Sequence, residues 1–111
     1  MFMNDEIASF AFAALGHPNR IRVLRLLVRA GPDGLTISSL RERLGVPATT
    51  FAHHLKALAE ADLVLQDKRG REVYSTANYA VIRNLASFLM KECCEDLACT
   101  PHPNDTEKEV S

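Results

Sequence analysis

The sequence predicts a mostly α-helical fold with a two-stranded β-hairpin wing, which together make a winged helix-turn-helix. Two short helical segments, residues 38–44 and 47–61, are joined by a tight turn that contains Gly45, as is typical of a helix-turn-helix. A hairpin pattern at residues 63–76 follows directly, with apolar and polar residues alternating around a basic tip. Amphipathic helical segments precede and follow this unit, so helices dominate the fold.

The length of 111 residues fits one domain, which we place at residues 1–99, followed by a flexible, polar tail at residues 100–111. No apolar run approaches the ~18 residues that span a bilayer. The acidic N-terminus lacks the basic flank of a signal peptide. We therefore expect a cytoplasmic protein with reduced thiols and no membrane partner.

The charge is distributed unevenly along the chain. Residues 17–75 contain ten Lys and Arg against six Asp and Glu, a net charge of +4, whereas residues 1–16 carry −2 and residues 76–111 carry −3. A basic middle between acidic ends can place positive charge on one face of the molecule, although a solvated mixed surface explains the same numbers.

Caps and breaks place the first two helices. Asn4 or Asp5 can cap the first helix through a side-chain oxygen, and Gly16 is expected to end it. Pro18 suits the first turn of the second helix, which is expected to end at the Gly-Pro-Asp-Gly break of residues 31–34.

The helix-turn-helix follows this break. Residues 35–37 make at most a minimal strand, and Ser38 is expected to cap a short helix that ends before Gly45. Pro47 is expected to open the second helix of the motif, which extends to about Ala61.

A last helix is expected from about Asn78 to Ala98, beyond the wing. Its apolar stripe and that of the first helix exceed what so small a domain need bury alone. We therefore expect a two-fold homodimer through these two helices. The candidate interface residues are Phe10, Leu85, Phe88 and Leu89.

Three segments resemble the arsenic-repressor (ArsR/SmtB) family. They are ALGHPNRIR at residues 14–22, FAHHLKAL followed by ADLV within residues 51–64, and KRGREVY at residues 68–74. All three occur in the family's order and together cover most of residues 10–90. The resemblance implies a dimeric repressor that leaves its operator when an inducer binds. Two metal sites found in the family are missing, because residues 40–44 contain no cysteine and the last helix contains no histidine.

A recognition helix packs one face on its domain and presents the other to the major groove of operator DNA. In residues 47–61 the packed face belongs to Phe51, Leu55 and Leu58. Thr and His can bond to base edges or phosphates, and Lys is mainly a phosphate contact. The wing arginines can reach phosphates or an adjacent minor groove. His54 is left open between a DNA contact and a bond inside the domain. The candidate DNA contacts, which need no cofactor, are Thr49, Thr50, His53, Lys56, Arg69 and Arg71.

The three cysteines lie within seven residues, at Cys93, Cys94 and Cys99. An intact helix rises about 9 Å over six residues, so the helix would have to unwind after Cys94, or Cys99 would have to fold back, to bring the sulfurs together. Three thiolates without a neighbouring histidine suit trigonal As(III) or Sb(III). The arrangement is also similar to that of arsenite-responsive members of the resembled family. We therefore expect a trivalent metalloid as inducer.

Other interpretations of the cysteines remain open. His102 could complete a four-ligand zinc or cadmium site. The cluster is also compatible with a sensor of thiol oxidation or persulfides, or with no ligand at all. A small thiol enzyme would need an activated thiolate and an anion-binding loop, and no phosphate-cradling glycine loop is present, so we expect no enzyme. A winged helix that binds only proteins is a further alternative.

Overall fold

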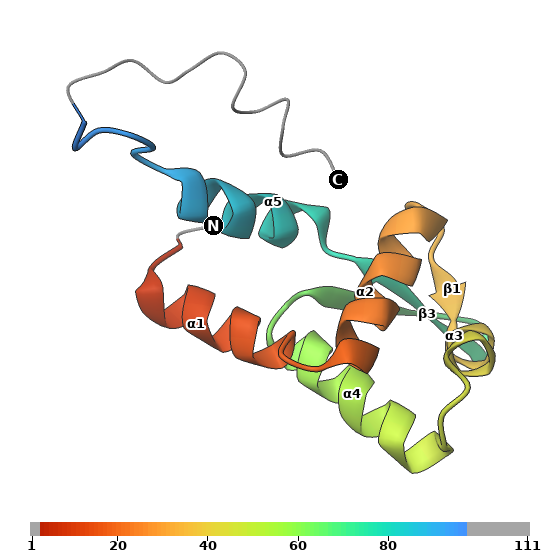
Figure 1. Ribbon diagram of the computed structural model, residues 1–111. Coiled ribbons are helices and arrows are strands. Elements are labelled where there is room, and N and C mark those ends of the chain that lie inside the picture. The colour runs from red at the N-terminus through yellow and green to blue at the C-terminus, as the bar shows by residue number, and fades with distance from the viewer. Residues whose placement is uncertain (1–2, 98–111) are drawn as a thin grey trace.

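The computed structural model describes residues 3–97, and its helices pack together with a small sheet on one side (Figure 1). The elements are α1 (Asp5–Ala14), α2 (Pro18–Ala30), β1 (Leu35–Thr36), α3 (Ile37–Leu44), α4 (Ala48–Glu60), β2 (Val64–Arg69), β3 (Glu72–Ala77) and α5 (Tyr79–Met90). This order confirms the predicted winged helix-turn-helix, with α3 and α4 as the motif and β2 and β3 as the wing. None of the helices in residues 3–97 has the length and apolar character needed to cross a membrane. The tail predicted for residues 100–111 lies outside the described residues.

Side-chain caps fix where several helices begin. The Oδ1 of Asn4 accepts from the Ile7 N–H at 2.8 Å, so Asn4 is the cap of α1. α1 ends at Ala14, two residues before the Gly16 that we expected to end it. The prediction that Ser38 caps α3 is wrong. Thr36 is the cap, because its Oγ1 accepts from the Ser39 N–H at 3.1 Å.

The sheet has the order β1-β3-β2 and is antiparallel throughout. β1 adds a short third strand to the wing and pairs Leu35 with Ser75. Gly34 precedes this strand with a φ of 72°, and a Cβ there would collide with the Ser75 carbonyl oxygen. Only glycine therefore allows β1 to approach β3 this closely.

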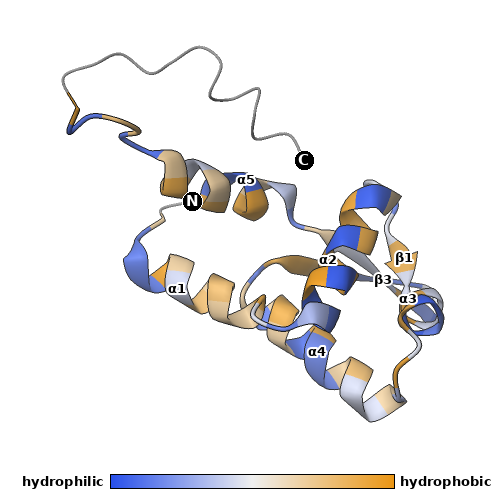
Figure 2. Cartoon of the chain, in the orientation of Figure 1, coloured by the Kyte–Doolittle hydropathy of each residue, from blue (hydrophilic) through white to orange (hydrophobic). Residues whose placement is uncertain are grey.

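The core lies where the five helices and the sheet meet. Figure 2 shows apolar and polar residues alternating along α2. The best-buried large side chains of the core include Leu27, Leu40, Leu58 and Leu63, each fully inaccessible to solvent. Burying a leucine stabilises a fold by about 1.5–3 kcal/mol. The core therefore fixes how α4 packs against the rest of the domain.

The last helix is shorter than the sequence predicted. α5 ends at Met90 rather than near Ala98, and residues 91–97 form consecutive turns. The segment beyond Met90 is mostly exposed, so it has little tertiary packing to extend the helix, and packing supplies most helical stability in proteins. Cys93 and Cys94 therefore lie beyond α5 and not on it.

Candidate functional site

The second helix of the motif, α4, has one buried and one exposed face. Phe51, Leu55 and Leu58 are buried, as predicted. The candidate DNA contacts on this helix are all exposed: Thr49, Thr50, His53 and Lys56. α4 thus meets the basic requirement of a recognition helix, which is a packed face opposite a free polar one.

His54 anchors α4 to the start of α2. Its Nδ1 accepts from the Arg20 Nε–H at 3.0 Å, and the same guanidinium donates to the Ala14 carbonyl oxygen at 3.3 Å. The His17 ring lies beside it, with 4.5 Å between ring centroids. Burial, followed by the charges of His17, Arg20 and His53, lowers the pKa of His54. The lowered pKa favours the neutral imidazole, in agreement with its role as the acceptor of the Arg20 N–H inside the domain.

The sequence left His54 open between a DNA contact and a bond inside the domain, and it did not identify the partner of this bond. Positions 51, 54, 55 and 58 follow the spacing i, i+3, i+4 and i+7, which places His54 on the buried face. Its partner Arg20 is 34 residues away in the chain, and no periodicity links the two.

The two arginines at the wing tip have different surroundings. Arg69 is held in place, because its Nε lies 2.9 Å from the Asp67 Oδ2 and its guanidinium carbon lies 4.5 Å from the centroid of the Tyr74 ring. Arg71 is exposed and has no carboxylate within 4 Å among residues 3–97. Arg71 is therefore the wing cation that is more readily available to a phosphate.

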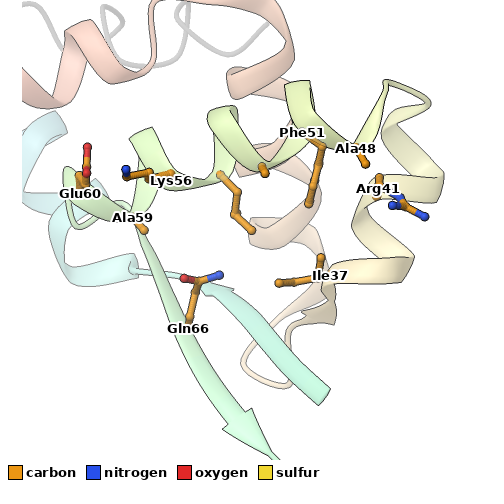
Figure 3. A pocket seen from close by; sticks show the side chains of 10 residues that line it. Ile37, Arg41, Ala48, Phe51, Lys56, Ala59, Glu60 and Gln66 are labelled. Atoms are coloured by element: carbon orange, nitrogen blue, oxygen red, sulfur yellow. The ribbon is translucent and has the colours of Figure 1, made fainter. Parts of the chain in front are cut away.

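A hollow of about 470 Å³ separates α4 from the wing. Figure 3 shows Lys56 of α4 and Arg41 of α3 on either side of it, with Gln66 of β2 across from the helix. Its lining combines mostly apolar side chains with two cations and one carboxylate, Glu60. It contains no histidine, cysteine or serine to act as a nucleophile. A concave surface with cations at its edges suits a DNA backbone that passes between helix and wing.

The described part of the cysteine cluster places two thiols together. The Sγ atoms of Cys93 and Cys94 are 3.6 Å apart; Cys93 is exposed and Cys94 is half-buried. Glu92 and Cys94 adopt left-handed backbone conformations, with φ of 64° and 63°. Cys99 lies outside the described residues, and within residues 3–97 no three His, Cys, Asp or Glu side chains are grouped as a metal site.

Known proteins with similar sequences or structures place this chain in a family. The model of a helix-turn-helix domain family matches residues 15–67. A solved ArsR-like transcriptional regulator from Rhodococcus sp. RHA1 is 33% identical, with a TM-score of 0.71, and the match covers 81% of this chain and 82% of that one. The chain belongs to the ArsR family of winged helix-turn-helix transcriptional regulators.

Two further relatives are similar to this ArsR-family regulator. The transcriptional repressor SdpR of Bacillus subtilis is 25% identical over 79 residues, which are 71% of this chain and 84% of SdpR. The homodimeric winged helix-turn-helix DNA-binding domain of Mb0332 from Mycobacterium bovis shares the fold at 20% identity, with a TM-score of 0.64 and coverage of 92% and 96%. The family consists of transcriptional regulators, in agreement with the expectation that the chain is not an enzyme.

The regulator carries exposed apolar side chains on α1 and α5. Phe10 is 57% exposed and Leu89 is 64% exposed, while Phe88 is half-buried beside the start of α1. Leu85 differs from the other candidate interface residues, because it is only 4% exposed and packs in the core of its own chain. Leu85 therefore offers almost no surface to a second copy, and the available apolar surface lies one turn further along α5.

Proposed function

We propose that this regulator is a homodimeric repressor that binds operator DNA and is released when As(III) or Sb(III) binds Cys93, Cys94 and Cys99. The observation that carries the inducer assignment is the pair of adjacent thiols, whose sulfurs lie 3.6 Å apart beyond the end of α5. These thiols follow shortly after the exposed apolar side chains of Leu89 and Met90.

The exposed face of α4 enters the major groove in this proposal. Thr49, Thr50 and His53 contact base edges near the start of the helix, and Lys56 contacts phosphate. The wing follows the adjacent backbone with Arg69 and Arg71. The Arg20–His54 bond holds α4 at a fixed angle to α2, which favours a single docking geometry.

The dimer places two α4 helices about one DNA turn apart, as two half-sites require. The exposed apolar side chains of α1 and α5, including Phe10 and Leu89, supply the contact surface. The homodimeric Mb0332 domain shares this fold, which supports the assembly. A repressor of this kind acts by occupying its operator, and the relative SdpR is a transcriptional repressor.

The thiol pair favours a thiophilic ion over a hard one, because soft thiolate ligands select soft ions. Residues 91–97 are held by isolated turn hydrogen bonds, such as Cys93 N–H to Met90 C=O at 3.1 Å. Such a segment can fold around an ion without breaking a helix. Cys99, five residues beyond Cys94, supplies the third thiolate of a trigonal site in this proposal.

Release follows if the bound ion changes how α5 packs in the dimer. Leu89 and Met90 are exposed and lie shortly before the thiols, so an ion bound by the three thiolates alters the surface that the second copy meets. A coupling free energy of about 1–3 kcal/mol, or about 5- to 150-fold in DNA affinity, is enough for a switch.

A DNA-release titration tests the proposal. Fluorescence anisotropy of a labelled duplex from upstream of the regulator's own gene is followed while arsenite, antimonite, zinc, cadmium or peroxide is added. Arsenite and antimonite should release the parent protein. The Cys93→Ser and Cys94→Ser variants should bind DNA as the parent does and ignore arsenite.

Cys99→Ser is the most informative variant. A monomethylated arsenic(III) species has only two exchangeable positions, so it should still release Cys99→Ser, whereas inorganic arsenite should act poorly. X-ray absorption of the arsenic-loaded parent should show sulfur neighbours only. Release by zinc or peroxide but not arsenite would reject the metalloid and leave the repressor intact. Absence of DNA binding by the parent would reject the repressor itself.

A further inference from the structure

Helix α2 carries an unusual concentration of positive charge. It contains Arg20, Arg22, Arg25 and Arg29, and no acidic residue between Pro18 and Ala30. Arg20 is turned inward and bonded to His54. The other three are exposed, and their spacing of three and four residues puts them on one face of the helix.

Arg43 of α3 extends this face. A hollow of about 220 Å³ is lined by Ile21, Arg22, Arg25, Leu26, Arg29 and Arg43, without a carboxylate. We call these four arginines the arginine face. The single ion pair within residues 3–97 joins Arg69 to Asp67 on the wing, so no carboxylate of the described structure lies within 4 Å of the arginine face. Four like charges gathered on one surface repel one another, and a bound anion relieves this repulsion.

We propose that the arginine face binds the phosphodiester backbone of duplex DNA on the flank of the helix-turn-helix opposite the wing. This inference rests on the proposed DNA binding and adds a second backbone contact to it. Guanidinium groups match phosphate oxygens in a planar, bidentate geometry. Arg22 and Arg29 are seven residues apart, about 10 Å along the helix. This length is enough for the face to contact more than one phosphate of a strand.

The position of α3 separates the two flanks. Arg41 lines the hollow between α4 and the wing, and Arg43 lines the hollow beside α2. Residues two apart on a helix point about 200° away from each other, so the two hollows lie on opposite sides of α3. A duplex whose major groove holds α4 has one backbone strand on each side of that helix. In this arrangement the wing contacts the backbone of one DNA strand, and the arginine face contacts the backbone of the other.

The test compares a variant of the arginine face with a control variant that removes positive charge elsewhere. Arg25→Gln/Arg29→Gln changes the arginine face, and Arg83→Gln removes an exposed cation of α5. Operator affinity is measured at several salt concentrations, together with a hydroxyl-radical footprint. Each phosphate that the protein no longer neutralises lowers the slope of log K against log salt by about 0.9. A dimer without four of its arginine–phosphate pairs should therefore have a slope that is smaller by about 3–4 units.

The arginine-face variant should also lose protection at backbone positions outside the bases covered by α4, and should weaken equally on operator and random duplex. The control variant should keep the parent's slope and footprint. If the parent binds its operator and the arginine-face variant keeps both slope and footprint, the inference is overturned while the proposed function stands. An equal loss per removed charge in both variants would show a net-charge effect and would also overturn it. Failure of the parent to bind DNA would instead reject the proposed function.

Discussion

Acid should destabilise this protein through His54, because the folded chain disfavours the imidazolium form. Burial and the charges of His17, Arg20 and His53 lower its pKa, whereas a histidine in the unfolded chain titrates near 6.5. The unfolded state therefore binds more protons below about pH 6.5. The free energy of unfolding should fall there by at most about 1.4 kcal/mol per pH unit for this one proton, and the contribution is complete above that pH.

The measurement is urea unfolding followed by circular dichroism between about pH 5 and pH 7.5. Asparagine at position 54 keeps an acceptor oxygen for the Arg20 Nε–H but cannot gain a proton in this range, so His54→Asn should remove this part of the acid slope. The exposed neighbour provides the control, since His53→Asn should keep the parent's slope. Parallel curves for the parent and His54→Asn would refute the reasoning.

Two further predictions concern the DNA and dimer surfaces. Arg71→Ala should weaken binding equally on operator and random duplex and should reduce the salt dependence of binding. His53→Ala should instead lower the preference for operator by about 1–3 kcal/mol for each base edge that His53 reads. Competition binding on both duplexes distinguishes the two effects, and equal losses of affinity on both duplexes for His53→Ala would exclude base reading. Phe10→Asp should produce folded monomers, because Phe10 is 57% exposed in the single chain and its replacement leaves the core intact. If analytical ultracentrifugation shows that this variant is still a dimer, α1 is not part of the interface.

The sequence predicted the helix-turn-helix well because burial controls that region. Phe51, Leu55 and Leu58 repeat at helical spacing, and all three are buried in the structure. The anchor at His54 could not be read in the same way, since a polar residue on an apolar face needs a partner to explain it. The packing of α2 on α4 brings that partner, Arg20, next to His54. This contact depends on tertiary structure and leaves no pattern in the sequence.

The apolar stripe of α5 shows a second limit. Leu85 and Leu89 are one turn apart and are equivalent in any helical pattern. The structure buries Leu85 to 4% exposure and leaves Leu89 at 64%. Periodicity identifies an apolar face, but it does not say which part of the face is covered by the chain itself and which part remains for a second copy.

The end of α5 was misplaced because residues 91–96 contain no Pro or Gly that would interrupt a helix. The helix ends where its packing against the core ends, with Lys91 as its cap. In a continuous helix, an ion would have to break backbone hydrogen bonds to collect three sulfurs. With Cys93 and Cys94 already in turns, the proposed ion can bind this thiol pair without breaking a helix, beside the exposed Leu89 and Met90. The proposed metalloid site and the proposed dimer surface therefore meet at the same end of α5, where a small local change would alter the surface that a second copy contacts.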